Sequence, residues 1–598
     1  MSASSSNDCL IVDGEDYIPT EEEEIAAIDF ELRQIEREQQ KLADQKQILI
    51  QRKEKIRDNA LLKKSLTLSR KNWDTENFSW SKNLRKALTE VFNIKDMRPL
   101  QLPTINATMS GEDVLLVMPT GGGKSLCYQL PAVIGKGITI VVSPLVALME
   151  DQLHGLHKNN VKAMMLSSKA GKENVKTIMT SLVDSKSGLK LIYVTPEYMA
   201  KSNRFMSKLQ KAHEMRRLDR FAIDEVHCCS QWGHDFRPDY KFLGILKSMF
   251  PGVPILGLTA TAPAKIIVDV QKMLEIQGCL VLRAPFNRPN LFYEVRRKPA
   301  DKDTCLAMIE NLLKNRFEGK SGIIYTTTIK DAEQLTTDLR AKGLKVGCYH
   351  AVLEPEFRTQ VYSKWISGSY QAVVATIAFG LGIDKPDVRF VIHHCLSKSM
   401  ESYYQESGRA GRDGKKSSCI VLYKLSDVFK LSTMVFQDKV GLQNLYNMLA
   451  FCLNSSSCRR SLIATHFEET WTKKDCAEMC DHCKKPKERR EIDVGPYCRQ
   501  LYTIMTKAVQ SETRLTALKL LDSWFNKGAV ALRVTSIPIP KFSRETGEAI
   551  VGHLLVNGYL QEDFHFSAYS TISYIKRGPK AGVALANDHK ILFEYEKC

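Results

Sequence analysis

Short apolar segments alternate with stretches of helical composition in two blocks of the chain. In residues 85–290 the apolar segments are VLLVM, ITIVVS, LKLIYV, RFAID and PILGLTA, and in residues 320–425 they are SGIIYT, KVGCYH, AVVAT, VRFVIHH and CIVLY. Strands that alternate with helices form parallel sheets covered on both faces. The pattern therefore predicts an α/β fold with two lobes, each built on its own parallel sheet.

The composition is that of a folded protein. Of the 598 residues, 43% are hydrophobic and 26% are charged, values that exclude wholesale disorder and a fibrous chain. No apolar run reaches the roughly 18 residues that a membrane helix needs, so we expect no membrane partner. The N-terminus is acidic and polar, unlike a secretory signal peptide. The 16 cysteines are therefore expected as reduced thiols or metal ligands rather than as disulfides.

The net charge of +17 is unevenly distributed. Residues 1–80 carry −5, residues 81–450 carry +17 and residues 451–598 carry +5, while the first forty residues alone carry −10. The basic central region is compatible with a polyanionic partner, whose binding should weaken as salt rises. The acidic N-terminal segment is not expected to contact such a partner.

Residues 1–20 are rich in Ser and Asp and predict a disordered tail. After this tail, apolar residues recur every seven positions, at Ile28, Ile35, Leu42, Leu49 and Ile56. Ile25 and Leu32 complete the first two pairs of a heptad pattern, and the later partner positions are polar. The pattern has two interpretations. One is a coiled-coil arm that makes a homo-oligomer, a dimer or higher; the other is one amphipathic helix lying on its own domain.

A glycine-rich loop joins the segment VLLVM to the helical stretch SLCYQL, and it contains Thr120, Gly121, Gly122, Gly123, Lys124 and Ser125. In such a loop the backbone N–H groups point at phosphates, the lysine reaches the β- and γ-phosphates, and the serine binds Mg²⁺. The usual pattern has a glycine six residues before the lysine, where this chain has Met118. We expect a nucleotide site here; a chance glycine-rich turn is the alternative for the loop taken alone.

An apolar strand ends in two adjacent carboxylates, Asp224 and Glu225, one hundred residues after the loop. In this position the first carboxylate holds Mg²⁺ through its waters, and the second orients and deprotonates the attacking water. An acidic turn at a strand end is the alternative, but the order of the two motifs favours a nucleotide hydrolase.

Four cysteines have the spacing C-x17-C-x3-C-x2-C, at Cys458, Cys476, Cys480 and Cys483. Four thiolates at these intervals can close a tetrahedral shell around Zn²⁺, and a closed shell of sulfurs is structural rather than catalytic. Nearby alternatives as ligands are Cys452, His466 and His482, and unrelated buried thiols are the alternative to a metal site.

Further segments extend the pattern and carry a family resemblance. DEVH stands where related proteins have DEAD, Thr259–Ala262 reads TATA, and residues 402–414 read SYYQESGRAGRDG. With the glycine-rich loop, these segments resemble a superfamily-two helicase, and the sequence is most similar to the RecQ family of DNA helicases, in particular to its short vertebrate members. The resemblance covers roughly residues 80–590, and it also matches the four cysteines to the RecQ zinc subdomain.

The resemblance implies RecA-like lobes that bind ATP between them. In the family's adenine-reading motif, Arg98 stacks on adenine and Gln101 hydrogen-bonds its edge, with Met97 where Phe is commoner. Arg409 and Arg412 match the arginines that the second lobe supplies to the γ-phosphate, and Gln405 is expected to contact the nucleotide. Such arginines are typically worth ~10³ or more in rate.

The resemblance also implies DNA contacts. Trp232, Phe236 and Arg237 lie in a segment similar to the RecQ aromatic-rich loop, where rings stack on unpaired bases and an arginine meets phosphate. The C-terminal region resembles a winged-helix domain, and Tyr569 stands where a hairpin tip would present an aromatic wedge to the last base pair. For Trp232 and Phe236 the alternative is packing in a core; for Tyr569 it is cross-strand packing.

The expected fold is therefore α/β, with two RecA-like lobes followed by a helical zinc-binding subdomain and a winged-helix domain with a β-hairpin. The expected divisions are an N-terminal tail and candidate coiled-coil helix (1–80), lobe 1 (81–295), lobe 2 (296–430), the zinc-binding subdomain (431–490) and the winged-helix domain (491–598).

The expected function is an ATP-, Mg²⁺- and zinc-dependent DNA helicase in the nucleus. The resemblance implies 3′-to-5′ movement on single-stranded DNA and unwinding of forks or junctions in repair, replication or recombination, with a single-strand DNA-binding protein as an expected partner. The alternatives are an RNA helicase or translocase, and a strand-annealing or junction-holding scaffold that ATP switches. A basic run at 484–490 fits a nuclear localisation signal, a phosphate contact or a solvated linker equally well.

Overall fold

The computed structural model describes residues 20–168, 170–230, 236–380, 385–486, 488–567, 570–586 and 588–596. It separates into two units, Met1–Arg70 and Lys71–Cys598. The expected disordered tail lies almost wholly outside the described residues, as do the predicted DNA contacts Trp232 and Tyr569.

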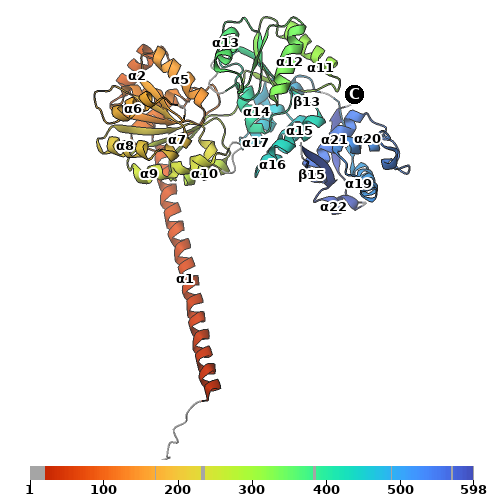
Figure 1. Cartoon of the computed structure of the whole chain (residues 1–598), viewed down its shortest axis with the longest axis horizontal. Helices are drawn as coiled ribbons and strands as arrows, with labels where there is room; N and C mark the ends of the chain where they lie inside the picture. The colour runs from red at the N-terminus through yellow and green to blue at the C-terminus, as the bar shows by residue number, and fades with distance from the viewer. Residues whose placement is uncertain are drawn as a thin grey trace, which may run out of the picture. The chain divides into compact units, whose positions relative to one another are not determined.

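The described part of the first unit is one helix, α1 (Glu21–Arg70), drawn in red in Figure 1. Its apolar heptad side chains are 50% to 65% exposed: Ile25, Ile28, Leu32, Ile35, Leu42, Leu49 and Ile56. The apolar stripe read from the sequence is therefore exposed on the helix, with polar partner positions after Ile35.

The first lobe of the second unit contains a seven-stranded sheet in the described chain, with all neighbouring strands parallel and the order β3-β4-β2-β5-β6-β1-β7. The strands are β1 (Val114–Val117), β2 (Ile138–Val142), β3 (Ala163–Leu166), β4 (Leu191–Val194), β5 (Leu218–Ile223), β6 (Ile255–Thr259) and β7 (Leu280–Arg283). Every residue of β1, β2, β4 and β6 is buried. Full burial means that both faces are covered, as continuous apolar runs predict for parallel strands.

The helices of this lobe connect and cover its strands (Figure 1). They are α2 (Ser81–Glu90), α3 (Gln101–Met109), α4 (Leu126–Ile134), α5 (Val146–Lys158), α6 (Lys172–Ser181), α7 (Pro196–Lys201), α8 (Asn203–Glu214), α9 (Leu246–Met249) and α10 (Ala264–Met273). Helices α3, α4 and α8 pack on β1, β2 and β5.

The second lobe has a parallel sheet of six described strands in the order β10-β11-β9-β12-β13-β8. These are β8 (Leu291–Arg297), β9 (Ser321–Tyr325), β10 (Val346–Tyr349), β11 (Ala372–Ala375), β12 (Val388–His393) and β13 (Ser417–Tyr423). The main helices are α11 (Lys302–Asn311), α12 (Ile329–Ala341), α13 (Pro355–Ile366) and α14 (Met400–Ser407). The two predicted parallel-sheet lobes are confirmed.

Strand β8 begins the second sheet at Leu291, a few residues before the expected division at 295/296. Its first three residues are buried, and exposure increases from Glu294 to Arg297, at the C-terminal end of this edge strand. Its mixed sequence, LFYEVRR, lacks the continuous apolar run that marked the inner strands.

A helical region follows, with α15 (Leu425–Val435), α16 (Gly441–Leu453), α17 (Arg459–His466) and α18 (Asp481–Lys484). The C-terminal region combines α19 (Gly495–Gln510), α20 (Ala517–Trp524), α21 (Arg544–Val556) and α22 (Ala581–Leu585) with two antiparallel strand pairs. The pairs are β14 (Arg489–Asp493) with β17 (Leu592–Glu596), and β15 (Leu560–Phe566) with β16 (Thr571–Arg577). The second pair is the predicted hairpin.

In the part of the chain that the structure describes, none of the helices has both the length and the apolar character needed to cross a membrane.

Candidate functional sites

A cavity of about 630 Å³ lies between the two lobes. Its lining includes these residues predicted to act on the nucleotide: Arg98, Gln101, Thr120, Gly121, Gly123, Lys124, Ser125, Asp224, Glu225, Gln405, Arg409 and Arg412. The predicted contacts Met97 and Gly122 are not among the residues that line the cavity. The glycine-rich loop follows β1, and the two carboxylates follow β5. They meet because β5, β6 and β1 are neighbours in the sheet and all end at the same edge.

The glycine-rich loop takes a conformation that its glycines require. Gly121 and Gly123 have φ values of +82° and +88°, in the left-handed region that other residues adopt only with strain. The Gly122 N–H donates to the Pro119 carbonyl at 2.9 Å. A side chain on Gly122 would strike the buried side chain of Met118. Met118, the residue that departs from the usual pattern, therefore packs under the loop, in the space that a side chain at position 122 would need.

Lys124 lies near the end of the loop, just before α4. Its Nζ donates to the Met118 carbonyl at 3.0 Å. Desolvation lowers the pKa of Lys124, although the carboxylates of Glu225 and Asp224 oppose this change. An ammonium group held away from water is stabilised by an anion, and a nucleotide phosphate supplies one.

Gln101 and Arg98 hold the loop from the N-terminal side. Gln101 is buried; its Oε1 accepts the Arg98 N–H at 2.7 Å, and its Nε2 donates to the Gly123 carbonyl at 2.9 Å. The Arg98 guanidinium also donates to the Gly121 carbonyl. The residues predicted to read adenine are thus fixed against the phosphate loop, and their contacts with adenine stay predictions.

The two acidic residues follow strand β5 directly. Glu225 has a φ of +48°, a left-handed conformation that costs energy in a non-glycine residue and is found at functional sites. The Asp224 Oδ1 accepts the Glu225 N–H at 3.0 Å. Desolvation, and then the neighbouring Glu225 carboxylate, raise the pKa of Asp224 to about 7. Two carboxylates this close favour a bound cation, which would relieve their repulsion.

The second lobe contributes Gln405, Arg409 and Arg412 from α14 and the turn after it. The Gln405 Nε2 donates to the Glu225 Oε1 at 3.3 Å, a direct contact between the lobes. A Cβ on Gly121 would lie 3.0 Å from the Cγ of Arg412, so this arginine rests against the phosphate loop. Arg409 is buried, and within the described residues its Nε has no hydrogen-bond partner. A buried guanidinium with an unused donor fits an anionic phosphate.

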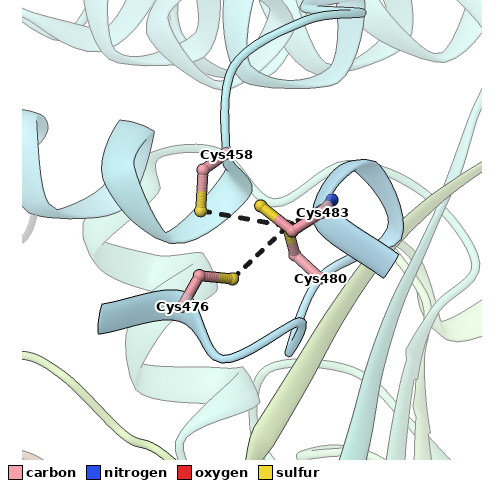
Figure 2. A group of neighbouring side chains, drawn as sticks. All are labelled: Cys458, Cys476, Cys480 and Cys483. Atoms are coloured by element: carbon pink, nitrogen blue, oxygen red, sulfur yellow. Dashed lines mark hydrogen bonds between the residues drawn. The ribbon is translucent and has the colours of Figure 1, made fainter. Parts of the chain in front are cut away.

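The four cysteines converge, as Figure 2 shows. Their sulfur atoms all lie within 4.8 Å of one another, with Sγ distances of 3.7 Å from Cys476 to Cys480 and 3.9 Å from Cys480 to Cys458. Cys458 precedes α17, Cys476 ends a 3₁₀ helix, and Cys480 and Cys483 flank the start of α18. A set of four sulfurs fits a structural zinc ion.

The nearby alternatives are engaged elsewhere. His466 Nε2 lies 2.8 Å from Glu401 Oε1, and His482 Nδ1 lies 2.7 Å from the Ser457 carbonyl. Among the described residues that could hold a metal, the cluster contains the four predicted cysteines and omits Cys452.

The cysteine cluster is attached to the edge of the second sheet. The Tyr293 N–H of β8 donates to the Met479 carbonyl at 3.2 Å, and the Val295 N–H donates to Asp481 Oδ2 at 3.0 Å. Arg459 Nε donates to the same carboxylate at 3.1 Å. The cluster therefore uses backbone groups that an uncovered edge strand would leave unpaired.

Two of the four predicted DNA contacts are described. Phe236 is half-buried, with the Lys241 ammonium 5.7 Å from its ring centroid. Arg237 Nη1 donates to the Pro144 carbonyl at 3.0 Å, and a 3₁₀ helix over Pro238–Ile245 follows. The C-terminal side of the aromatic segment is therefore tied to the first lobe.

The comparisons with known proteins agree with these sites. The DEAD/DEAH box helicase family matches residues 98–270, the helicase conserved C-terminal domain matches 304–414, and the RecQ zinc-binding family matches 425–484. The ATP-dependent DNA helicase Q1 of Rattus norvegicus is 48% identical over 97% of this chain and 94% of the relative, and that of Pongo abelii is 52% identical over 88% and 81%. The chain belongs to the RecQ family of ATP-dependent DNA helicases. RecQ membership and the converging sites confirm ATP and zinc as its cofactors.

A solved structure of the helicase Lhr of Mycobacterium smegmatis, bound to ssDNA and AMP-PNP, overlays on this RecQ chain with a TM-score of 0.48 and 20% identity, over 83% of this chain and 60% of that one. The fold assignment rests instead on the strand orders of the two sheets.

Sequence reasoning missed two polar residues of this RecQ helicase. Arg288, between the two sheets, donates to main-chain carbonyls of both lobes. Glu562, on the hairpin strand β15, is buried and accepts hydrogen bonds from three hydroxyl groups. Neither lies in a motif with a known spacing, so the sequence alone offered no signal for them.

Proposed function

We propose that this RecQ helicase moves 3′-to-5′ along one strand of DNA by closing and reopening its two lobes, and that the β15–β16 hairpin parts the duplex ahead. The observation that carries the proposal is the cavity lined from both lobes, in which Gln405 of the second lobe contacts Glu225 of the first at 3.3 Å. Because both lobes hold the nucleotide, its hydrolysis changes the distance between them.

Residues of the first lobe hold the phosphates and position the water. Lys124 neutralises the β- and γ-phosphates, while Ser125 and Asp224 are the magnesium ligands, Asp224 acting through water. A Mg²⁺ ion held by these two residues would supply positive charge to the phosphate oxygens. Glu225 accepts the proton of the attacking water, and its contact with Gln405 fixes its carboxylate.

Arg409 and Arg412 of the second lobe contact the γ-phosphate when the lobes close. Both side chains line the cavity, Arg412 lies against Gly121 of the loop, and the unused Nε of Arg409 is available to the phosphate. After hydrolysis this attraction is lost and the lobes separate. Arg98 and Gln101 select adenine while they hold the loop, with Met97 beside them.

The strand contacts are made by the aromatic segment and the hairpin. Trp232 and Phe236 stack on unpaired bases and Arg237 meets phosphate, while Tyr569 at the hairpin tip stacks on the last base pair. The exposed ring of Phe566, at the end of β15, supports an apolar tip, since it is 71% exposed.

The substrates are forks or junctions in nuclear DNA repair, replication or recombination, and a single-strand DNA-binding protein keeps the separated strands apart. Direction and setting are supported by the family resemblance.

The first experiment is strand displacement with DNA and RNA duplexes of matched sequence. We expect ATP-dependent displacement of a DNA duplex with a 3′ tail, and none for a 5′-tailed DNA or an RNA duplex. Displacement of RNA alone would contradict the proposal.

Tyr569→Ala should slow DNA displacement roughly tenfold, since a base–aromatic stack is worth about 1–3 kcal/mol. Tyr574→Phe, which keeps the ring on strand β16, is the control and should unwind normally.

Strand annealing is separated from unwinding by Lys124→Ala. The substitution removes the phosphate contact but leaves the basic surface, so annealing of complementary strands should survive and unwinding should not. Loss of both activities would show that annealing also requires nucleotide, as a scaffold switched by ATP would.

The exposed apolar face of α1 supports self-association into a dimer or higher oligomer. Leu42→Ser with Leu49→Ser removes two members of the stripe, whereas Gln34→Ser with Gln45→Ser changes two exposed polar positions of the same helix. We expect light scattering to show a shift toward the 67.7 kDa chain mass for the first variant only. Unchanged masses for both variants would place self-association elsewhere.

A further inference from the structure

A second cavity, of about 1070 Å³, is bordered by strand β8 of the second lobe, helix α18 after the cysteine cluster, and elements α21 and β17 of the C-terminal region. It shares no lining residue with the nucleotide cavity. Nine arginines and lysines line it against four acidic residues. The excess of cations in one hollow requires either counter-charges from the protein or a ligand with several negative charges.

The base of the cavity is a fixed ionic network. Arg316 Nη1 lies 2.6 Å from Glu294 Oε2, and its Nη2 donates to the Ser418 hydroxyl at 3.2 Å. Arg296 Nε lies 2.5 Å from the other oxygen of the same carboxylate. One carboxylate between two guanidinium groups leaves a net positive charge, held in place by β8 and β13.

The rim carries lysines that the protein does not neutralise. Lys320, Lys416, Lys484 and Lys485 line the cavity, are exposed, and form no ion pair with a carboxylate in the described residues. The Lys484 ammonium lies 5.6 Å from the centroid of the Phe292 ring. Lys484 and Lys485 open the basic run at 484–490, so the structure turns this end of the run toward a cavity rather than into a plain linker.

We propose that this cavity binds the phosphodiester backbone of a second DNA strand, the one that the motor does not track. The proposal rests on the proposed unwinding, which produces a second strand next to the hairpin. The hairpin belongs to the same C-terminal region as the wall of the cavity, because α21 packs on β15. A polyphosphate chain matches the spaced ammonium groups, and a flexible single strand can follow a concave surface.

The experiment uses the full chain and measures DNA affinity by fluorescence anisotropy at several salt concentrations. The variant is Lys320→Ala with Lys416→Ala and Lys485→Ala. The control removes the same charge from α12 and its following turn, with Lys330→Ala, Lys342→Ala and Lys345→Ala, all exposed and outside the cavity. The probes are a forked duplex with two tails and the same duplex with only the 3′ tail.

Each phosphate contact with a single strand contributes roughly 0.7 to the slope of log affinity against log salt. We expect the cavity variant to lose about 2 units of this slope for the fork and little for the one-tailed duplex, because three contacts are removed. The control should keep both slopes. Hydrolysis of ATP stimulated by a 3′-tailed DNA should not change in either variant.

Equal slope losses in the two triple variants, or the same loss with both probes, would overturn the inference. The proposed function is tested separately by strand displacement with the unsubstituted chain. If that chain unwinds DNA and the cavity variant keeps its fork slope, only the second-strand site is wrong.

Discussion

The Arg288 guanidinium donates to the carbonyl of Thr120, in the phosphate loop, at 3.1 Å. The same nitrogen donates to the Gly408 carbonyl at 3.2 Å, and the other terminal nitrogen donates to Ala410 and Gly411 at 3.2 and 3.3 Å. Arg409 is the residue between two of these carbonyls. One side chain in the connection between the sheets thus fixes the phosphate loop relative to the turn that presents the arginines.

Arg288→Ala should therefore reduce DNA-stimulated ATP hydrolysis more than it reduces ATP binding. Hydrogen bonds to a charged group are worth about 1.5–3 kcal/mol, so we expect a fall in kcat of roughly tenfold or more. Arg288→Lys should fall between, because an ammonium lacks the second terminal nitrogen, which donates to the Ala410 and Gly411 carbonyls. The control is Arg283→Ala, whose guanidinium donates to the Ala262 carbonyl of its own lobe. Equal losses in kcat for Arg283→Ala would contradict a specific coupling by Arg288.

Removal of zinc should unfold the region that carries the cysteine cluster. Metal binding and folding are linked in such sites, with apparent binding free energies of about 10–16 kcal/mol in zinc-finger peptides. We expect Cys480→Ser, or a chelator, to lower the Tm and to abolish unwinding, and metal analysis to show zinc lost in parallel. Cys452→Ser changes a buried thiol outside the cluster and should keep its zinc. A Tm unaffected by complete zinc removal would exclude a structural role.

Magnesium-dependent nucleotide binding should weaken at acidic pH. The pKa of Asp224 is raised to about 7 by desolvation and by Glu225, so below that pH the carboxyl is protonated and competes with the metal. We expect the Mg²⁺ concentration that half-saturates nucleotide binding to rise as the pH falls from 8 to 6. Glu225→Gln removes the second cause and should move this change to lower pH. Identical half-saturation at pH 6 and pH 8 would show that Asp224 does not hold the metal.

The inner strands and the motif residues were predictable because their signals are local. The runs VLLVM, ITIVVS and RFAID became β1, β2 and β5, since strands buried on both faces need continuous apolar sequence. Strand β8 was missed because it is an edge strand, bordered on one side by the cysteine cluster rather than by another strand, and it mixes charged and apolar residues. The second sheet therefore begins at Leu291, before the division expected at 295/296.

The parts of the candidate nucleotide site that belong to sequence motifs, in the glycine-rich loop and at strand ends, were predictable. Lys124, Asp224 and Arg409 each belong to a motif, and the strand order brings them to one cavity. Arg288 was not predictable, since it binds main-chain carbonyls, which any sequence supplies. Its role depends on the three-dimensional approach of two turns that are far apart in the chain.

The stability of the hairpin should depend on the protonation of Glu562. Burial raises the pKa of this carboxyl above its ordinary value of 4.5, although hydroxyl groups of Ser432, Ser573 and Tyr446 donate to it, the last at 2.7 Å. The folded chain then binds the proton more tightly than the unfolded chain, so this contribution to stability is complete below pH 4.5 and is lost as the pH rises through the folded pKa. Glu562→Gln removes the titration, and its Tm relative to the unsubstituted chain should increase from pH 4.5 toward neutrality. A Tm difference that does not change with pH would mean that the carboxyl has the same pKa in both states. Glu562→Ala removes the acceptor of three hydroxyl groups, of which Ser432 still has the Phe429 carbonyl, and it should lower the Tm at every pH and slow unwinding while sparing DNA-stimulated ATP hydrolysis.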